Sequence, residues 1–254
     1  MEPERQEVVV ESFVRTEVHG EVLLVVLDRP EKRNAFHTEM NGEFGAALFA
    51  GQQHGCIVIT GAGPGFCSGL DLRFDPADLP NSGYEVGWAQ MRTSRVPIIA
   101  AVNGPAVVGG LAIVANADFA VASDHASFRD TELQVIGYGN AELMSALQRR
   151  VGSAWARQMT LTGMTVDAAT ALRIGLVNEI VPHDELVERA LELAAAIAVH
   201  DRAAVSVMRR EWDAVEGLSP TAALWMHEDY LRPFAHAPAA FQDESRVQGL
   251  LGRS

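Results

Sequence analysis

The chain has 254 residues, a hydrophobic content of 48% and a formal net charge of −13 at pH 7. This length and apolar content suit one globular core with an appended segment, without a low-complexity tract. The strong negative charge disfavours nucleic acids and anionic membranes, so neither is expected as a partner.

Apolar periodicity and turn residues divide the first half of the chain into alternating strands and helices. In chain order these are two strands within 8–27 joined by a turn at 18–21, a helix at 38–50, a strand at 56–60, a helix near 84–95, a strand at 98–102, a helix at about 109–116 and a strand at 118–122. Thr38 is expected to cap the first helix. The alternation indicates crossover connections and buried sheets, for which a doubly wound fold is the default.

The apolar stretch 97–115 is long enough to span a bilayer. The residues Asn103, Gly104 and Pro105 interrupt it, and two further glycines, Gly109 and Gly110, interrupt it again. The stretch therefore predicts a strand, a turn and a buried helix rather than a membrane span.

The last quarter of the chain predicts helices over 184–199, 203–216 and 219–233, the last starting at Ser219-Pro220. We therefore expect a core over residues 1–195 and a helical region over 196–254. That region carries more large apolar side chains than a short tail can bury by itself, namely Trp212, Trp225, Tyr230, Leu231 and Phe234. These side chains are expected to pack on the core or on neighbouring subunits.

Two glycine-rich segments, 61–72 and 103–110, each follow a predicted buried strand. Glycine lets the backbone turn tightly and approach a ligand closely. Two strand-to-loop switches of this kind can direct backbone N–H groups at one spot, where they stabilise a developing oxyanion.

These segments resemble the two oxyanion motifs of the enoyl-CoA hydratase/isomerase (crotonase) superfamily. The resemblance is carried by four segments in the family's order: 27–35, 66–71, 96–110 and 161–181. It implies an α/β spiral of repeated ββα turns in place of a doubly wound sheet, followed by a C-terminal helical oligomerisation region. It also implies a homotrimer, often paired into a hexamer, that acts on acyl-CoA, and the presence of only two cysteines fits the reducing cytoplasm.

By this resemblance the backbone amides of Leu70 and Gly109 form the oxyanion hole. Glu132 occupies the register of the second catalytic glutamate of the hydratases, and Ala112 stands where they carry the first. Addition of water uses two carboxylates, whereas one carboxylate is enough to move a proton from C2 to C4. Isomerase chemistry with a single glutamate is therefore favoured.

Other residues are candidates for the same site. Glu142 and Asp130 are carboxylates that could replace the missing glutamate, although Glu142 also fits an acid in a first helical turn and Glu132 could pair with an arginine. The remaining substrate-binding candidates are the basic cluster Arg29, Lys32 and Arg33, the loop residues Ser68, Gly69, Asp71 and Gly110, and Tyr138.

The pattern of possible metal and nucleophile residues is sparse. Histidines are scattered without ligand spacing, and no Walker or dinucleotide fingerprint occurs. We expect no metal and no redox cofactor, with coenzyme A entering as part of the substrate. Of the two cysteines, which fit a reducing compartment, Cys67 is expected to be a packing residue.

The C-terminal segment 240–251 keeps Phe241 but lacks the basic pair with which many family members cover the adenine end of CoA. Two alternatives therefore stay open. One is a C–C bond hydrolase or lyase on a β-diketone-like substrate, using the same oxyanion hole with Glu142. The other is a degenerate subunit that binds acyl-CoA without turnover.

Overall fold

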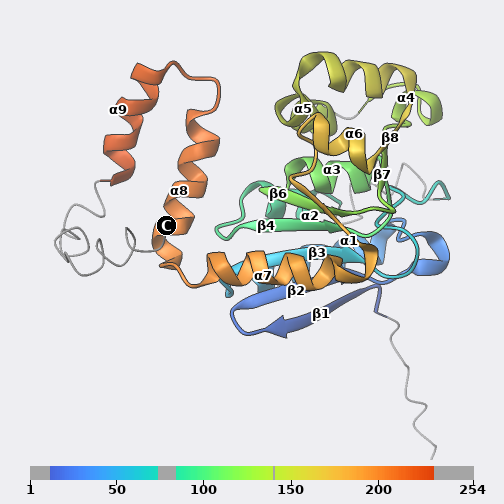
Figure 1. Cartoon of the computed structure of the whole chain (residues 1–254), viewed down its shortest axis with the longest axis horizontal. Helices are drawn as coiled ribbons and strands as arrows, with labels where there is room; N and C mark the ends of the chain where they lie inside the picture. Colours follow the sequence, from blue (N-terminus) through green and yellow to red (C-terminus); the bar gives the residue numbers. More distant parts are fainter. Residues whose placement is uncertain (1–11, 74–83, 140, 232–254) are drawn as a thin grey trace, which may run out of the picture. The chain divides into compact units, whose positions relative to one another are not determined.

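The computed structural model describes residues 12–73, 84–139 and 141–231 (Figure 1). The chain divides into two compact units between Val205 and Ser206, and each is described by itself. The strands are β1 (Val14–His19), β2 (Val22–Leu27), β3 (Cys56–Gly61), β4 (Ile98–Val102), β5 (Pro105–Val107), β6 (Phe119–Ser123), β7 (Ser127–Arg129), β8 (Thr165–Asp167) and β9 (Glu179–Val181). The helices are α1 (Thr38–Gly51), α2 (Tyr84–Arg92), α3 (Gly109–Asn116), α4 (Glu132–Val135), α5 (Ala141–Thr162), α6 (Ala168–Arg173), α7 (Leu186–Ala198), α8 (Arg202–Val215) and α9 (Pro220–Leu231), with short 3-10 helices η1 (Pro30–Lys32) and η3 (His183–Glu185).

The first unit is built on a six-stranded sheet with the order β1-β2-β3-β4-β6-β9. Only β1 is antiparallel to its neighbour, and the other strands pair in parallel. Every residue of β2 and β4 is buried, as expected for a parallel sheet covered on both faces. On one face α7 packs Leu186, Ala190 and Ala194 against the strands, and α1 and α2 belong to the other side (Figure 1).

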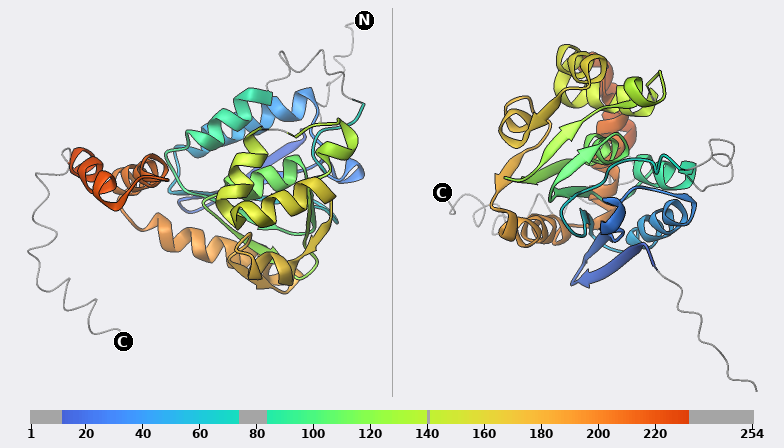
Figure 2. Two further views of the ribbon diagram at one scale, coloured as in Figure 1. Left: turned by 90° about the horizontal axis from the view of Figure 1, so that it is seen from above. Right: turned by 90° about the vertical axis from the view of Figure 1, so that its right-hand side faces the viewer.

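A second, three-stranded sheet has the order β5-β7-β8. Consecutive strands go alternately to the two sheets: β4 then β5, and β6 then β7. A helix completes each of these turns, and Figure 2 shows the turns stacked side by side. Cys67 continues the pattern one turn earlier, because it forms a parallel bridge with Ala106 of β5. A doubly wound fold would place all these strands in one sheet, so this topology is the expected spiral.

The stretch 97–115 forms β4, β5 and α3, in agreement with the strand, turn and helix expected there. Among the described residues, no helix combines the length and the apolar character that crossing a membrane requires. The capping prediction was wrong: α1 begins at Thr38, and His37 holds the cap position without a side-chain cap hydrogen bond.

The second unit contains the end of α8 and helix α9, close to the helices predicted for this region. The imidazole of His227 on α9 pairs with the carboxylate of Glu211 on α8. Trp212 and Trp225 are exposed, with 63% and 75% of their surfaces accessible. Phe234 and Phe241, which entered the expectations for this region, lie outside the described residues.

Candidate active site

The two glycine-rich loops meet where predicted. A Cβ atom added to Gly69 would lie 3.2 Å from the backbone nitrogen of Gly109, and one added to Gly109 would lie 3.2 Å from the Cα of Gly69. Gly69 also has a φ of +91°, which side chains rarely adopt. Both requirements explain why glycine is needed at the contact between the loops.

Within the described residues, no backbone hydrogen bond engages the amide of Leu70 or that of Gly109. The bridge between Phe36 and Leu70 uses the Gly69 carbonyl and the Asp71 N–H, which leaves the Leu70 N–H outside it. Gly109 is the first residue of α3, so its N–H precedes the hydrogen bonds within the helix. Both residues line a cavity of about 540 Å³, and two such donors stabilise an oxyanion.

The remaining loop residues divide between cavity wall and support. Ser68 lines the cavity, and its hydroxyl donates to the Lys32 carbonyl at 3.3 Å. Gly110 is buried beneath the wall, where an added Cβ would lie 2.3 Å from the carbonyl oxygen of Cys67. Gly110 therefore serves the close packing of α3 on the first loop.

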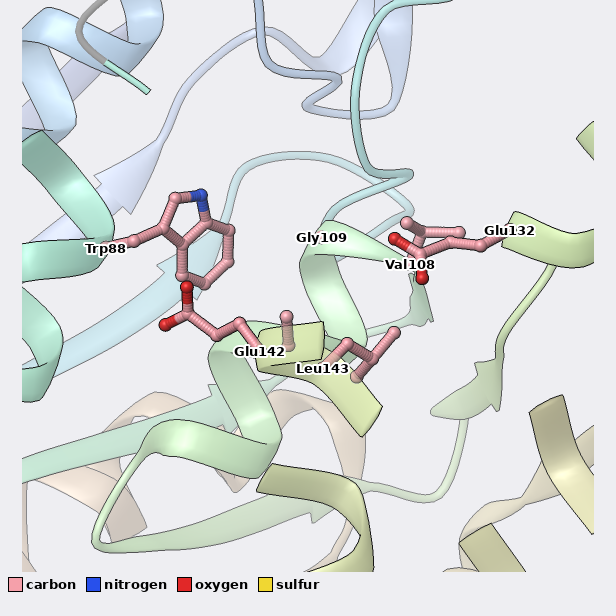
Figure 3. Close-up of a pocket in the computed structure, with 7 residues that line it drawn as sticks. Trp88, Val108, Gly109, Glu132, Glu142 and Leu143 are labelled. Atoms are coloured by element: carbon pink, nitrogen blue, oxygen red, sulfur yellow. The ribbon is translucent and has the colours of Figure 1, made fainter. Parts of the chain in front are cut away.

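Glu132 opens helix α4 and lines the cavity together with residues of both loops. Its side chain is buried, with 6% exposed, and it lines both the main cavity and a smaller adjoining pocket with Gly109. Figure 3 shows its carboxylate directed toward Val108 at the start of α3. This is a suitable position for a general acid or base beside a bound carbonyl.

Asp130 lies only two residues earlier but supports the site from behind. It is completely buried, and its carboxylate accepts hydrogen bonds from the Glu132 N–H at 3.0 Å and the Thr160 hydroxyl at 2.6 Å. Asp130 thereby fixes the start of α4 and the backbone position of Glu132.

Glu142 and Ala112 share the smaller pocket with Trp88. The Glu142 carboxylate lies beside the Trp88 indole, across the pocket from Glu132 (Figure 3). It accepts a hydrogen bond from the Arg92 guanidinium at 2.6 Å. Ala112 contributes only a methyl group to this wall, so Glu142 is the second carboxylate of the pocket.

The basic cluster Arg29, Lys32 and Arg33 does not line the cavity: Arg29 binds neighbouring protein groups, and the other two side chains are exposed. Arg29 donates to the Ala35 carbonyl at 2.9 Å and to the Asp71 carboxylate at 3.0 Å. The pKa of Asp71 is lowered, chiefly by a hydrogen bond from the Arg73 N–H. Partial burial opposes this shift to a smaller extent, and the hydrogen bond from Arg29 lowers the pKa further. Lys32 and Arg33 are exposed.

Seven of the predicted site residues lie on the walls of the two cavities: Ser68, Gly69, Leu70, Gly109, Glu132, Tyr138 and Glu142. Within the described part of the chain, six others lie outside those walls: Arg29, Lys32, Arg33, Asp71, Gly110 and Asp130. Tyr138 stands at the rim with 70% of its surface exposed.

Two important residues were not singled out from the sequence. Asn34 is completely buried, and its side-chain amide donates to the carbonyls of Ala62, Gly65 and Phe66 at 2.9–3.1 Å. In the sequence, Asn34 is marked only by its place in the motif at 27–35. Trp88 forms a wall of both cavities, and no recognisable pattern in the sequence marks it.

Both cysteines, Cys56 and Cys67, are free and buried. Burial raises the pKa of the Cys67 thiol to about 12, and the thiol is fully buried beneath the first loop. Cys67 is thus a packing residue, as expected. Within the described ranges no group of three or more histidine, cysteine or acidic side chains is placed to hold a metal ion.

The structure thus combines a spiral of paired sheets with a cavity lined by Leu70, Gly109 and the buried Glu132. Comparison with known proteins identifies the family of the chain. Residues 17–232 match the sequence model of the Enoyl-CoA hydratase/isomerase family. A probable enoyl-CoA hydratase of Rhizobium meliloti is 36% identical over 192 residues, which cover 72% of this chain and 74% of that protein. The chain belongs to the enoyl-CoA hydratase/isomerase family, as its motifs predicted.

Solved structures show the same fold. A probable enoyl-CoA hydratase/isomerase from Mycobacterium abscessus is 31% identical, with a TM-score of 0.77 and coverage of 92% of this chain and 97% of the other. A monofunctional enoyl-CoA isomerase from M. smegmatis is 30% identical, with a TM-score of 0.72 and coverage of 84% and 98%. The chain is therefore a crotonase-fold acyl-CoA enzyme of the hydratase/isomerase type.

Proposed function

We propose that the protein moves a double bond in an enoyl-CoA thioester, with Glu132 as the single general acid–base group. The observation that carries the proposal is the pairing of a buried Glu132 with a methyl group at Ala112 on the walls of one pocket. One carboxylate can take a proton from one carbon and return it to another.

In the proposed reaction the thioester oxygen accepts hydrogen bonds from the Leu70 and Gly109 amides. The Glu132 carboxylate removes a proton from C2 of a 3-enoyl group, and the electron pair of that C–H bond delocalises into a dienolate whose charge rests on the thioester oxygen. Protonated Glu132 then returns the proton to C4, which leaves the double bond between C2 and C3. The two amides lower the energy of the enolate.

The test is turnover of a 3-enoyl-CoA by the wild type and by Glu132→Gln, which keeps the shape and removes the titrating group. We expect kcat to fall by at least about 100-fold. The matched control is Glu142→Gln, which should retain most of the isomerase activity. Loss of less than about threefold in Glu132→Gln contradicts the assignment.

A second candidate function follows from Glu142 in the same pocket. If Glu142 supplied a second acid–base group, the site could hydrate a 2-enoyl-CoA or cleave a C–C bond in a β-diketone-like substrate. Crotonyl-CoA hydration by the wild type, Glu142→Gln and Ala112→Glu separates these cases. Fast hydration that Glu142→Gln abolishes supports the second candidate, and binding of acyl-CoA without any turnover supports a degenerate subunit.

We further propose that the helical region over 196–254 mediates a homotrimer or hexamer in the cytoplasm, and that no metal or redox cofactor takes part. The exposed tryptophans Trp212 and Trp225 support the first point, because apolar surface of this kind is typical of interfaces. Trp225→Ser should shift the mass distribution of the native protein toward the monomer. An unchanged mass would contradict a role for this face.

A further inference from the structure

Val108 adopts a backbone conformation that is unfavourable for its residue type. Its φ is +46° and its ψ is −99°, close to the first central position of a type II′ turn, where glycine dominates. A β-branched residue at positive φ is a genuine outlier, and such strain persists where the surroundings impose it. Here the Val108 N–H donates to the Arg129 carbonyl at 3.0 Å, and its carbonyl accepts from the Ala112 N–H at 2.8 Å.

The strained conformation places the Val108 side chain at the junction of the two oxyanion loops. A Cβ added to Gly69 would lie 3.1 Å from the Cβ of Val108, so the isopropyl group stands against the residue that precedes the Leu70 amide. The peptide plane that follows Val108 carries the Gly109 N–H, so the ψ of Val108 also orients that donor. Val108 therefore flanks both proposed donors.

Val108 also faces the proposed base. Val108 and Glu132 line both the main cavity and the smaller pocket, and Figure 3 shows them together on the side of the pocket away from Trp88. A carbonyl bound to the two amides would put its attached C2 carbon between the loops and Glu132. The space around C2 is the space that the isopropyl group restricts.

We infer that Val108 is a specificity-determining residue that restricts the enzyme to acyl groups without a substituent at C2. The inference rests on the proposed function for the position of the thioester carbonyl. A methyl group at C2 would have to share the volume taken by the isopropyl group. Overpacking of this kind is unfavourable, and one methylene in a pocket changes discrimination by about 10–200-fold.

The test compares binding of two isomers, butyryl-CoA and isobutyryl-CoA, by calorimetry. They have the same atoms and differ only in a branch at C2, and both are saturated, so neither can undergo the proposed double-bond shift. The wild type should bind butyryl-CoA at least about tenfold more tightly. Val108→Ala and Val108→Gly should reduce this ratio to within about threefold. Val107→Ala removes the same atoms from the preceding residue, which lines neither cavity, and should keep the wild-type ratio.

Thermal unfolding of the two variants provides a second measurement. Val108→Gly should have the higher Tm, because glycine is relieved of a strain that alanine retains. A Tm below that of Val108→Ala would overturn the strain argument. A wild-type ratio near one, a ratio unchanged in both Val108 variants, or no binding of either thioester would overturn the specificity assignment. If Glu132→Gln kept full turnover while the wild type still preferred butyryl-CoA to isobutyryl-CoA, the proposed proton transfer would be refuted and the specificity assignment would stand.

Discussion

Replacing Asn34 by aspartate tests how the opening motif of the chain supports the oxyanion loop. Aspartate has nearly the same shape and tolerates the φ of +56° at this position. The change replaces the side-chain NH₂ group, which donates to the Ala62, Gly65 and Phe66 carbonyls at 3.0, 2.9 and 3.1 Å, by an oxygen. Two buried carbonyls, those of Gly65 and Phe66, and the partly buried Ala62 carbonyl would then face an acceptor rather than a donor.

The expected loss can be worked from these contacts. Two N–H groups each lose about 1 kcal/mol of net hydrogen bonding, and each buried carbonyl left unpaired adds about 1–3 kcal/mol. The sum is smaller in practice because the loop can relax and because two N–H groups are shared among three carbonyls. We therefore expect the free energy of unfolding to fall by about 3–5 kcal/mol. At about 2–4 °C per kcal/mol for a chain of this size, Tm should fall by about 6–20 °C.

The assay is urea and thermal unfolding at one fixed protein concentration, because assembly shifts apparent stability. Asn116→Asp is the matched control, since among the described residues the Asn116 side chain donates only to a carbonyl of its own helix, that of Ala112, at 2.9 Å. The control should lose about 1 kcal/mol. An Asn34→Asp variant no less stable than the control would refute the structural role assigned to Asn34.

Three further predictions concern the site and its support. Gly109→Pro, which deletes the amide donor, should turn over about 10²–10³-fold more slowly than Gly109→Ala, which keeps it; equal kcat values would exclude this donor. Because the pKa of Asp71 is lowered in the folded state, its stabilising effect exists above the ordinary aspartate value of about 4 and is lost as pH falls through the folded-state pKa. Asp71→Asn should therefore be less stable than the wild type at pH 7 and equally stable in acid, whereas a pH-independent difference would contradict the ionic role. Cys67, with a pKa of about 12 and no exposure, should resist iodoacetamide in the native protein at pH 8 and react after unfolding in urea, as followed by mass spectrometry.

The elements that could be predicted from sequence are those with a strong local signal. The apolar runs at β3 and β4 are five or six residues long and are bounded by glycine, proline or asparagine, so length and composition identify them as buried strands. The glycine-rich loops likewise indicate a close approach of the backbone, whereas the assignment of Leu70 and Gly109 came from the resemblance of these loops to the family's motifs. The strands β5, β7, β8 and β9 have three residues each, which is too short for a period to be visible.

The different roles of the neighbouring carboxylates Asp130 and Glu132 depended on tertiary structure. Asp130 and Glu132 are similar carboxylates two positions apart, yet Asp130 is held by Thr160 from α5 while Glu132 reaches the cavity. That difference arises because the chain passes from β7 into α4 between these two positions. The partner of Asp130, Thr160, lies 30 residues further along the chain. A pattern within one segment contains no information about such a partner.

The sequence by itself determined the family, the strand-to-loop switches and the residue types at the oxyanion loops, because glycine and apolar periodicity act over a few neighbouring residues. Only the tertiary structure decided that Arg29 supports Asp71, that Trp88 lines the pocket and that a strained Val108 lies against Gly69. These roles are contacts between segments far apart in the chain. Their energies depend on distances and dihedral angles that arise only when the two sheets and their helices pack together.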